Sequence, residues 1–115
     1  MQAPGQLNLK MWQGASWSYT LTWTLSSGPV NLGGYSARLQ ARESIASSAP
    51  VLSLTSSDGI ALGGSAGTIT LTRSATQTAA LPPGRYIYDL ELETAGGVVT
   101  RLVEGILTID AEVTR

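Results

Sequence analysis

The sequence predicts a single all-β domain, an immunoglobulin-like antiparallel sandwich of roughly seven or eight strands with one short helical crossover. Three observations predict it. Apolar and polar residues alternate with a period of two along most of the chain. Clusters of Gly, Pro and Ser interrupt this alternation about every 8–15 residues, and helical periodicity is nearly absent. Because 115 residues is the usual length of one domain, residues 1–115 are predicted to form one unit.

The individual strands follow from the alternation. In the clearest one, residues 17–23, serine and threonine occupy one face and the other face carries Trp17, Tyr19, Leu21 and Trp23. We expect this aromatic face to pack into the core. The same pattern predicts further strands at residues 7–11, 35–42, 51–55, 60–62, 68–72, 85–94 and 98–110.

The one predicted helix covers residues 74–81 and connects two strands. Ser74 can cap its free backbone N–H groups, and the Pro-Pro-Gly run at 82–84 must end it. Gly105 lies inside the last predicted strand, where glycine usually marks a bulge or a close backbone approach. Residues 111–115 are expected to project from the edge of the domain.

The residue types that are missing exclude several kinds of chemistry. The chain has no cysteine and no histidine, which excludes disulfides, thiolate nucleophiles, imidazole bases and most transition-metal sites. Only 13% of the residues are charged and the net charge is −1, so no surface for nucleic acid or an anionic membrane is predicted. The first residues do not form a secretory signal and no apolar run could span a bilayer, which predicts synthesis in the cytoplasm.

Two motifs superficially resemble sites of chemistry. Asp89, Glu91 and Glu93 alternate along one strand at spacings of about 7 Å, within the range of paired glycosidase carboxylates, but a regular strand without a cleft favours a solvated face. Residues 63–67 (GGSAG) resemble a phosphate-binding loop but lack its Gly-Lys-Ser/Thr ending, which favours a hairpin turn. We therefore predict no enzyme, no cofactor and no metal site.

Four residues are candidates for an interaction surface. Trp12 has the opposite parity to Leu9, so it is expected outside the core, and tryptophan often dominates binding energy. Arginine is also enriched at interfaces, and the further candidates are Arg38, Arg42 and Arg101. Ordinary solvated strand positions are the alternative for these arginines. Because aromatic rings can stack on sugars, carbohydrate binding is an open alternative for the aromatic residues.

Five stretches of the chain resemble a family of small phage and prophage proteins. They are residues 12–23 (WQGASWSYTLTW), 34–43 (GYSARLQARE), 67–72 (GTITLT), 84–92 (GRYIYDLEL) and 100–115 (TRLVEGILTIDAEVTR). The chain is also similar to the N-terminal domain of phage baseplate upper proteins, an immunoglobulin-like module that ties a receptor-binding apparatus to the tail. This resemblance runs almost from end to end.

The resemblance implies a structural component of a tailed-phage virion, an adaptor or decoration subunit of the tail, neck or baseplate rather than an enzyme. The partners it implies are other virion proteins and copies of the same chain. This sequence departs from the baseplate proteins because it ends where the module ends, which favours a separate adaptor or decoration subunit over direct host recognition. A carbohydrate-binding or host-adhesion module on the virion surface is the alternative.

Overall fold

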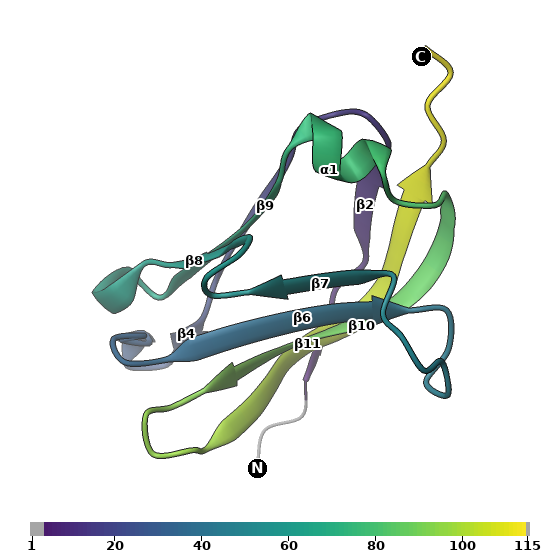
Figure 1. The fold of residues 1–115 in the computed structure, drawn as a ribbon. Helices are drawn as coiled ribbons and strands as arrows, with labels where there is room; N and C mark the ends of the chain where they lie inside the picture. Colours follow the sequence, from purple (N-terminus) through teal and green to yellow (C-terminus); the bar gives the residue numbers. More distant parts are fainter. Residues whose placement is uncertain (1–3, 115) are drawn as a thin grey trace.

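The chain forms a two-sheet β sandwich in a computed structural model that describes residues 4–114 (Figure 1). Three of the eleven strands in this described part have only two residues, and the other eight agree with the predicted number. The elements are β1 (Gly5–Gln6), β2 (Leu9–Trp12), β3 (Trp17–Thr22), β4 (Thr24–Leu25), β5 (Gly28–Pro29), β6 (Ser36–Arg42), β7 (Leu52–Thr55), β8 (Ile60–Leu62), the 3-10 turn η1 (Gly64–Ala66), β9 (Thr68–Arg73), α1 (Ala75–Ala79), β10 (Gly84–Glu93) and β11 (Val99–Asp110).

Two sheets build the sandwich. Sheet A has the order β1-β11-β10-β6-β7, with β2 also paired to β11, and sheet B has the order β3-β9-β8. Figure 1 shows β6, β7, β10 and β11 in one layer and β8 and β9 in the other. The order β11-β10-β6-β7 against β3-β9-β8 matches strands G, F, C and C′ against B, E and D of a variable-type immunoglobulin domain.

The first two strands differ from the antiparallel prediction, because β1 and β2 both run parallel to β11. Between them the Leu7 N–H donates to the Glu104 carbonyl at 2.9 Å, and the Asn8 side-chain oxygen accepts from the Ile106 N–H at 3.1 Å. The predicted strand at 7–11 thus corresponds to β2, which together with β1 forms an interrupted edge strand beside β11. Side-chain alternation identifies a strand but does not show in which direction its neighbour runs.

The core contains side chains from both sheets and confirms the predicted inward faces. Trp17 is buried, while Tyr19, Leu21 and Trp23 are half-buried and pack against the core. The Trp23 ring meets Tyr35 edge-on, with the ring centroids 6.2 Å apart. The buried hydrophobic residues are Leu9, Met11, Trp17, Leu32, Ala37, Leu39, Ala41, Leu52, Leu54, Ile60, Ile69, Leu71, Tyr86, Tyr88, Leu90, Leu92, Leu107 and Ile109.

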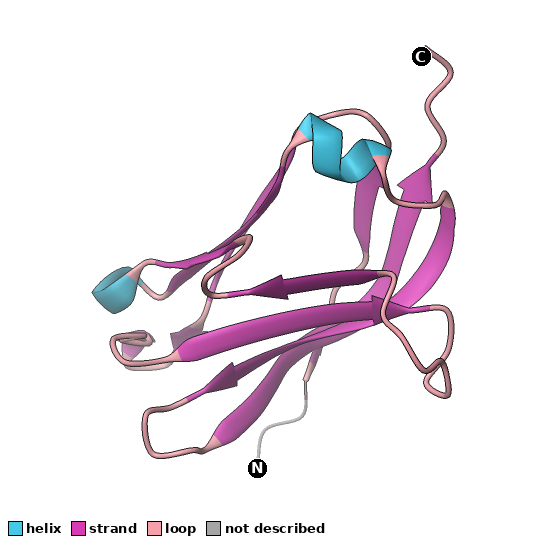
Figure 2. Cartoon of the chain, viewed as in Figure 1, coloured by secondary structure: helices cyan, strands magenta, loops and turns pink. Residues whose placement is uncertain are grey.

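The helical crossover is present but shorter than the predicted 74–81 (Figure 2). Ser74 caps α1: its hydroxyl accepts from the Gln77 N–H at 3.2 Å, and the Gln77 side chain accepts from the Ser74 N–H at 2.9 Å. Thr78 is fully buried and donates from its hydroxyl to the Ala15 carbonyl at 2.9 Å. This bond ties the crossover to the turn between β2 and β3.

A hydrogen bond near the start of β10 supports the fold class. The Tyr86 hydroxyl donates to the Pro82 carbonyl at 2.7 Å. A tyrosine that bonds back to the chain just before strand F is the tyrosine corner of immunoglobulin domains. Together with the strand order, it identifies the fold as the predicted immunoglobulin-like sandwich.

Gly105 marks the close backbone approach that its position predicts. A Cβ atom at this position would collide with the Leu7 carbonyl, so only glycine fits here without a shift of the N-terminal edge. The bulge in this strand lies three residues earlier, where Leu102 has no register partner on β10.

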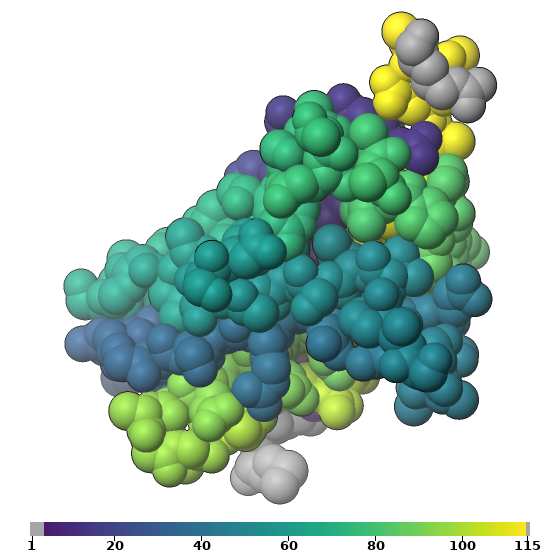
Figure 3. Space-filling model, in the orientation of Figure 1, coloured from purple at the N-terminus to yellow at the C-terminus, as the bar shows by residue number. Residues whose placement is uncertain are grey.

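The chain leaves the sandwich after β11. Residues 111–114 extend away from the body, as predicted (Figure 3), and Val113 is 92% exposed. Glu112 holds the start of this segment, because its N–H donates to the Gln13 side chain at 3.0 Å and its carboxylate lies against Gly14. Arg115, also expected to project, lies outside the described residues.

Candidate functional site

The outer face of sheet A gathers much of the charge of this weakly charged chain. Nine of its fifteen charged side chains lie on β6, β10 and β11 with an outward direction; Arg85 and Asp110 lie at the start of β10 and the end of β11, and the other seven lie together farther along the sheet. We call this surface the charged face, and it consists of Arg38, Arg42, Asp89, Glu91, Glu93, Arg101 and Glu104. Three of the four predicted interface residues are therefore neighbours, although they are far apart in the sequence.

Arg38 joins two carboxylates on the neighbouring strand. It lies opposite Glu91 in the β6–β10 register, and its Nε donates to Glu91 at 2.9 Å while its Nη1 donates to Glu93 at 2.9 Å. Hydrogen bonds to Glu93 and Glu91 raise the pKa of Arg38, so its charge is fixed. The three side chains are partly exposed, so their ion pairs contribute little to stability. What these pairs do is hold the Arg38 guanidinium in a fixed position.

Arg101 separates two carboxylates that face each other directly. Asp89 on β10 and Glu104 on β11 are register partners, an arrangement in which like charges repel. The Arg101 guanidinium lies 3.4 Å from each carboxylate. In a regular strand residues 101 and 104 would point to opposite faces, and the bulge at Leu102 brings them to the same one.

The environment of Asp89 perturbs its carboxyl group. Burial raises the pKa of Asp89, Arg101 opposes this effect, and the neighbouring Glu91 and Glu104 carboxylates raise the pKa further. The pKa of Asp89 therefore lies above that of an ordinary aspartate.

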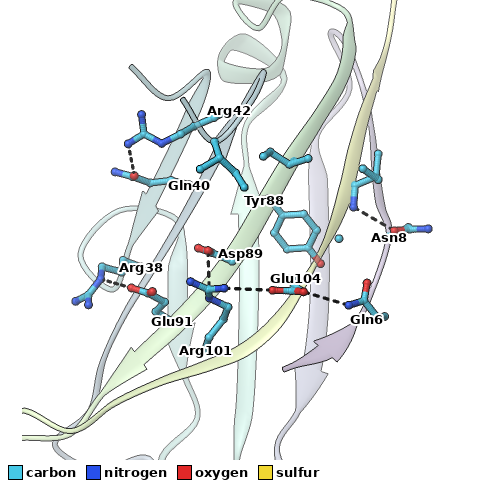
Figure 4. Close-up of a pocket in the computed structure, with 14 residues that line it drawn as sticks. Gln6, Asn8, Arg38, Gln40, Arg42, Tyr88, Asp89, Glu91, Arg101 and Glu104 are labelled. Atoms are coloured by element: carbon cyan, nitrogen blue, oxygen red, sulfur yellow. Dashed lines mark hydrogen bonds and ion pairs between the residues drawn. The ribbon is translucent and has the colours of Figure 1, made fainter. Parts of the chain in front are cut away.

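A shallow hollow of about 740 Å³ lies over the charged face (Figure 4). Besides the charged side chains, isoleucines line it: Ile87 and Ile106 are register partners on the outward face, and Ile45 comes from the β6–β7 loop with 90% of its surface exposed. Arg42 borders these residues and donates to the Ser47 carbonyl at 2.9 Å and to Gln40 at 2.8 Å. The surface combines paired charges with exposed aliphatic groups.

Trp12, the fourth predicted interface residue, lies on a different surface. It is 52% exposed at the end of β2, as its parity predicts, and the Lys10 ammonium lies 5.6 Å from its ring centroid. Lys10 also pairs with Asp110 at 3.1 Å. Trp12 lines a groove of about 360 Å³ between β2 and β3 rather than the hollow of the charged face.

The acidic row of β10 and the glycine-rich loop at 63–67, which superficially resemble sites of chemistry, lie on a strand and in a turn. Asp89, Glu91 and Glu93 alternate outward along β10, as predicted, but the expectation that no cleft lies beside them is wrong, because Asp89 and Glu91 line the hollow of the charged face. Residues 63–67 form the turn between β8 and β9. Within residues 4–114, no three acidic side chains are grouped to hold a metal ion. None of the helices in this range is long and apolar enough to cross a membrane.

Sequence reasoning missed two residues that the structure makes important. Ile45 falls in a predicted loop, and no pattern distinguishes it from other loop residues. Arg73 is buried at the end of β9, where its guanidinium donates to Asp58 and to the Ser53 carbonyl, both at 3.0 Å. Its parity matches the buried Ile69 and Leu71, a signal that lies one residue past the end of the predicted strand.

Comparisons with known proteins give a fold neighbour. No protein family and no curated protein matches the sequence. Among solved structures, the chain is similar to the extracellular domains of the voltage-gated sodium channel beta4 subunit, whose parallel homodimer structures explain its role in cell–cell adhesion. The identity is 13%, the TM-score is 0.44, and the alignment covers 98% of both chains. The assignment of this chain to the immunoglobulin-like class rests on its own strand order and tyrosine corner.

Proposed function

We propose that this protein is a non-enzymatic structural subunit of a tailed-phage particle, an adaptor or decoration protein of the tail, neck or baseplate. In this proposal it docks on other particle proteins through the charged face. The observation that carries it is the convergence of Arg38, Arg42 and Arg101 on one sheet face, next to exposed Ile45.

The composition of the charged face is suited to a protein partner. Arginine is enriched at interfaces, and the fully buried centre of an interface is more apolar than the rest of a protein surface. Arg38 and Arg101 already have carboxylate partners within the chain, so burial under a partner would leave neither cation unpaired. Ile45, Ile87 and Ile106 supply apolar area that the partner would remove from water.

The phage assignment itself rests on the sequence resemblance, which covers almost the whole chain. The expected location is the virion, after synthesis in the host cytoplasm. Many copies on a symmetric particle would add weak contacts together, so a modest area per copy is sufficient.

Particles that assemble in cells expressing this chain provide the test. Cross-linking and mass spectrometry of purified particles should find the protein joined to particle proteins through residues near the charged face. The double variant Ile45→Glu, Arg101→Glu should be lost from particles, while the control Thr72→Glu on the outer face of sheet B should be retained. Absence of the wild-type protein from particles, or equal incorporation of the double variant, contradicts the proposal.

A carbohydrate-binding or host-adhesion module is the second candidate, and the exposed Trp12 beside its groove favours it. A sugar that stacks on Trp12 would compete with the Lys10 ammonium for the ring. Titration of surface glycans with tryptophan fluorescence tests this candidate. A saturable response that Trp12→Ala removes and Leu25→Ala preserves would support adhesion.

A further inference from the structure

Strand β3 has an open edge. It pairs with β9 on one side, and the bond from the Trp23 N–H to the Gly67 carbonyl at 2.9 Å continues that register. Because bonded pairs alternate along an antiparallel ladder, the odd-numbered residues of β3 bond to β9. The N–H and C=O groups of Ser18, Thr20 and Thr22 therefore point away from sheet B, and within the described part of the chain no other backbone group pairs with them.

This edge lacks the features that usually keep an edge strand from pairing. Protected edges are short, or carry charges, prolines or bulges. β3 has six residues in continuous register with β9, and none of them is charged or proline. The opposite edge of sheet B, β8, has only three residues, and the neighbouring edge strand β2 carries Lys10.

The groove between β2 and β3 lies directly beside this open edge. Its lining includes Trp12, Ser18 and Tyr19, and the Trp17 indole N–H donates to the Lys10 carbonyl at 2.9 Å, which ties the two strands together. A strand added to β3 would cover this groove. It would also remove part of the half-exposed Trp12 ring from water.

We propose that β3 pairs antiparallel with β3 of a second copy of this chain, about a two-fold axis that passes by Thr20. In this register Thr20 faces Thr20 of the second copy, and Ser18 faces Thr22 of the second copy. The three residues with outward backbone groups are then matched in both directions, as an isologous interface requires. The pairing joins two three-stranded sheets into one of six strands.

Charge favours a second copy as the occupant. A two-fold axis places each side chain near its own equivalent, so any charge close to the axis repels itself. The strand has no charge on either face, and its outward neighbours on β9 are Thr68, Thr70 and Thr72. Thr20 already contacts Thr70 through their hydroxyls at 3.2 Å, so the joined sheet would present an uninterrupted row of uncharged hydroxyls.

This pairing deepens the assembly role proposed above and rests on it for its biological setting. It can nevertheless fail or hold separately, because it concerns the isolated chain and a surface other than the charged face. Loss from particles in the Ile45 and Arg101 variant tests docking, whereas the oligomeric state of the purified chain tests β3.

The experiment uses charge at the axis. Sedimentation velocity of the purified wild-type chain over a range of concentrations should show a monomer–dimer equilibrium. Thr20→Lys and Thr20→Asp should each be monomeric, because equal charges meet at the axis. Mixed in equal amounts, the two variants should form a heterodimer. The matched control Thr72→Lys, exposed on the same face one strand away, should dimerise as wild type does.

Two further measurements keep the result interpretable. Circular dichroism and thermal unfolding should show that both Thr20 variants keep the wild-type fold. Thr20→Pro removes the outward N–H donor, which β9 does not use, together with the hydroxyl contact to Thr70, and should also abolish the dimer. A wild-type chain that stays monomeric at its highest soluble concentration overturns the proposal, as does a dimer that persists in both charged variants.

Discussion

The Tyr88 hydroxyl donates a hydrogen bond of 2.5 Å to the Leu7 carbonyl, and the ring reaches it across Gly105. Tyr88 and Gly105 are register partners on β10 and β11, and a Cβ at residue 105 would occupy the place of the Leu7 carbonyl. Burial raises the pKa of the Tyr88 phenol, so it remains a donor at neutral pH. The parallel N-terminal edge thus depends on a tyrosine and a glycine that lie more than eighty positions away.

Tyr88→Phe should destabilise the fold by about 1–3 kcal/mol, because the buried ring keeps its packing while the Leu7 carbonyl loses its donor. Urea unfolding followed by tryptophan fluorescence measures the change. Relative to the wild type, hydrogen exchange in this variant should increase more at residues 5–12 than in β3. Unchanged exchange at the N-terminal edge would mean that the hydroxyl does not hold it.

Gly105→Ala should cost about 1–3 kcal/mol, since the new methyl group must displace the Leu7 backbone rather than a flexible side chain. The matched control is Gly96→Ala in the β10–β11 hairpin, where nothing but the Thr94 side chain lies near and φ is not positive. Thermal unfolding compares the two. Equal melting temperatures would show that the approach of Leu7 is not tight.

Arg101→Gln should raise the pKa of Asp89 further, because Asp89 and Glu104 would face each other with no cation between them. NMR titration of the side-chain carboxyl resonances measures this shift. Adding Glu104→Gln to the variant should reverse only part of this rise, because Glu104 influences the pKa of Asp89 less than Arg101 does. Stability should change by only about 0.5 kcal/mol, because these groups are partly exposed.

The raised pKa of Asp89 predicts a pH dependence of stability. Above the ordinary carboxyl value and up to the raised one, the folded state binds more protons than the unfolded state, so this group's contribution to stability falls as the pH rises. Asp89→Asn should therefore remove this fall, so the difference in unfolding free energy between the variant and the wild type should change with pH just above the ordinary carboxyl pKa of about 4. Urea titrations at several pH values test this, and an unchanged slope would contradict it.

Arg73→Met should lower the free energy of unfolding by about 1–3 kcal/mol, because the Ser53 carbonyl loses a donor that links β9 to β7. The methionine retains the apolar stem, so the loss reports the hydrogen bond and the pair with Asp58. Asp58→Asn is the control: it weakens the pair but leaves the Ser53 bond. Equal losses in both variants would place the effect in the ion pair.

Most strands could be predicted because their alternation records which side faces the core. Trp17 and Trp12 show how far this goes, since parity alone places the first inside and the second outside. The alternation does not show whether a strand runs parallel or antiparallel to its neighbour, so the parallel pairing of β1 and β2 with β11 could not be predicted. The length of β9 was underestimated because a buried arginine, Arg73, ends it.

The candidate site could be predicted as a set of residues but not as a surface. Arg38 and Arg42 alternate on one strand, so their common face follows from the sequence. Arg101 joins them only because of an irregularity in β11, and its odd spacing from Glu104 would have placed these two apart. Trp12 has the expected exposure but belongs to a separate groove.

Leu102 is an extra residue in β11 that has no register partner on β10. Leu102 and Val103 both pack against the core. The outward side chains of β11 are therefore odd-numbered before Leu102 and even-numbered after Val103. Deleting this single leucine would place Arg101 directly before Val103, which keeps Arg101 opposite Glu91 on the outer face and leaves the hairpin tip where it is. Removal of Leu102 should therefore be better tolerated than removal of a residue from the regular part of β11, which would reverse the facing direction of every side chain on one side of it.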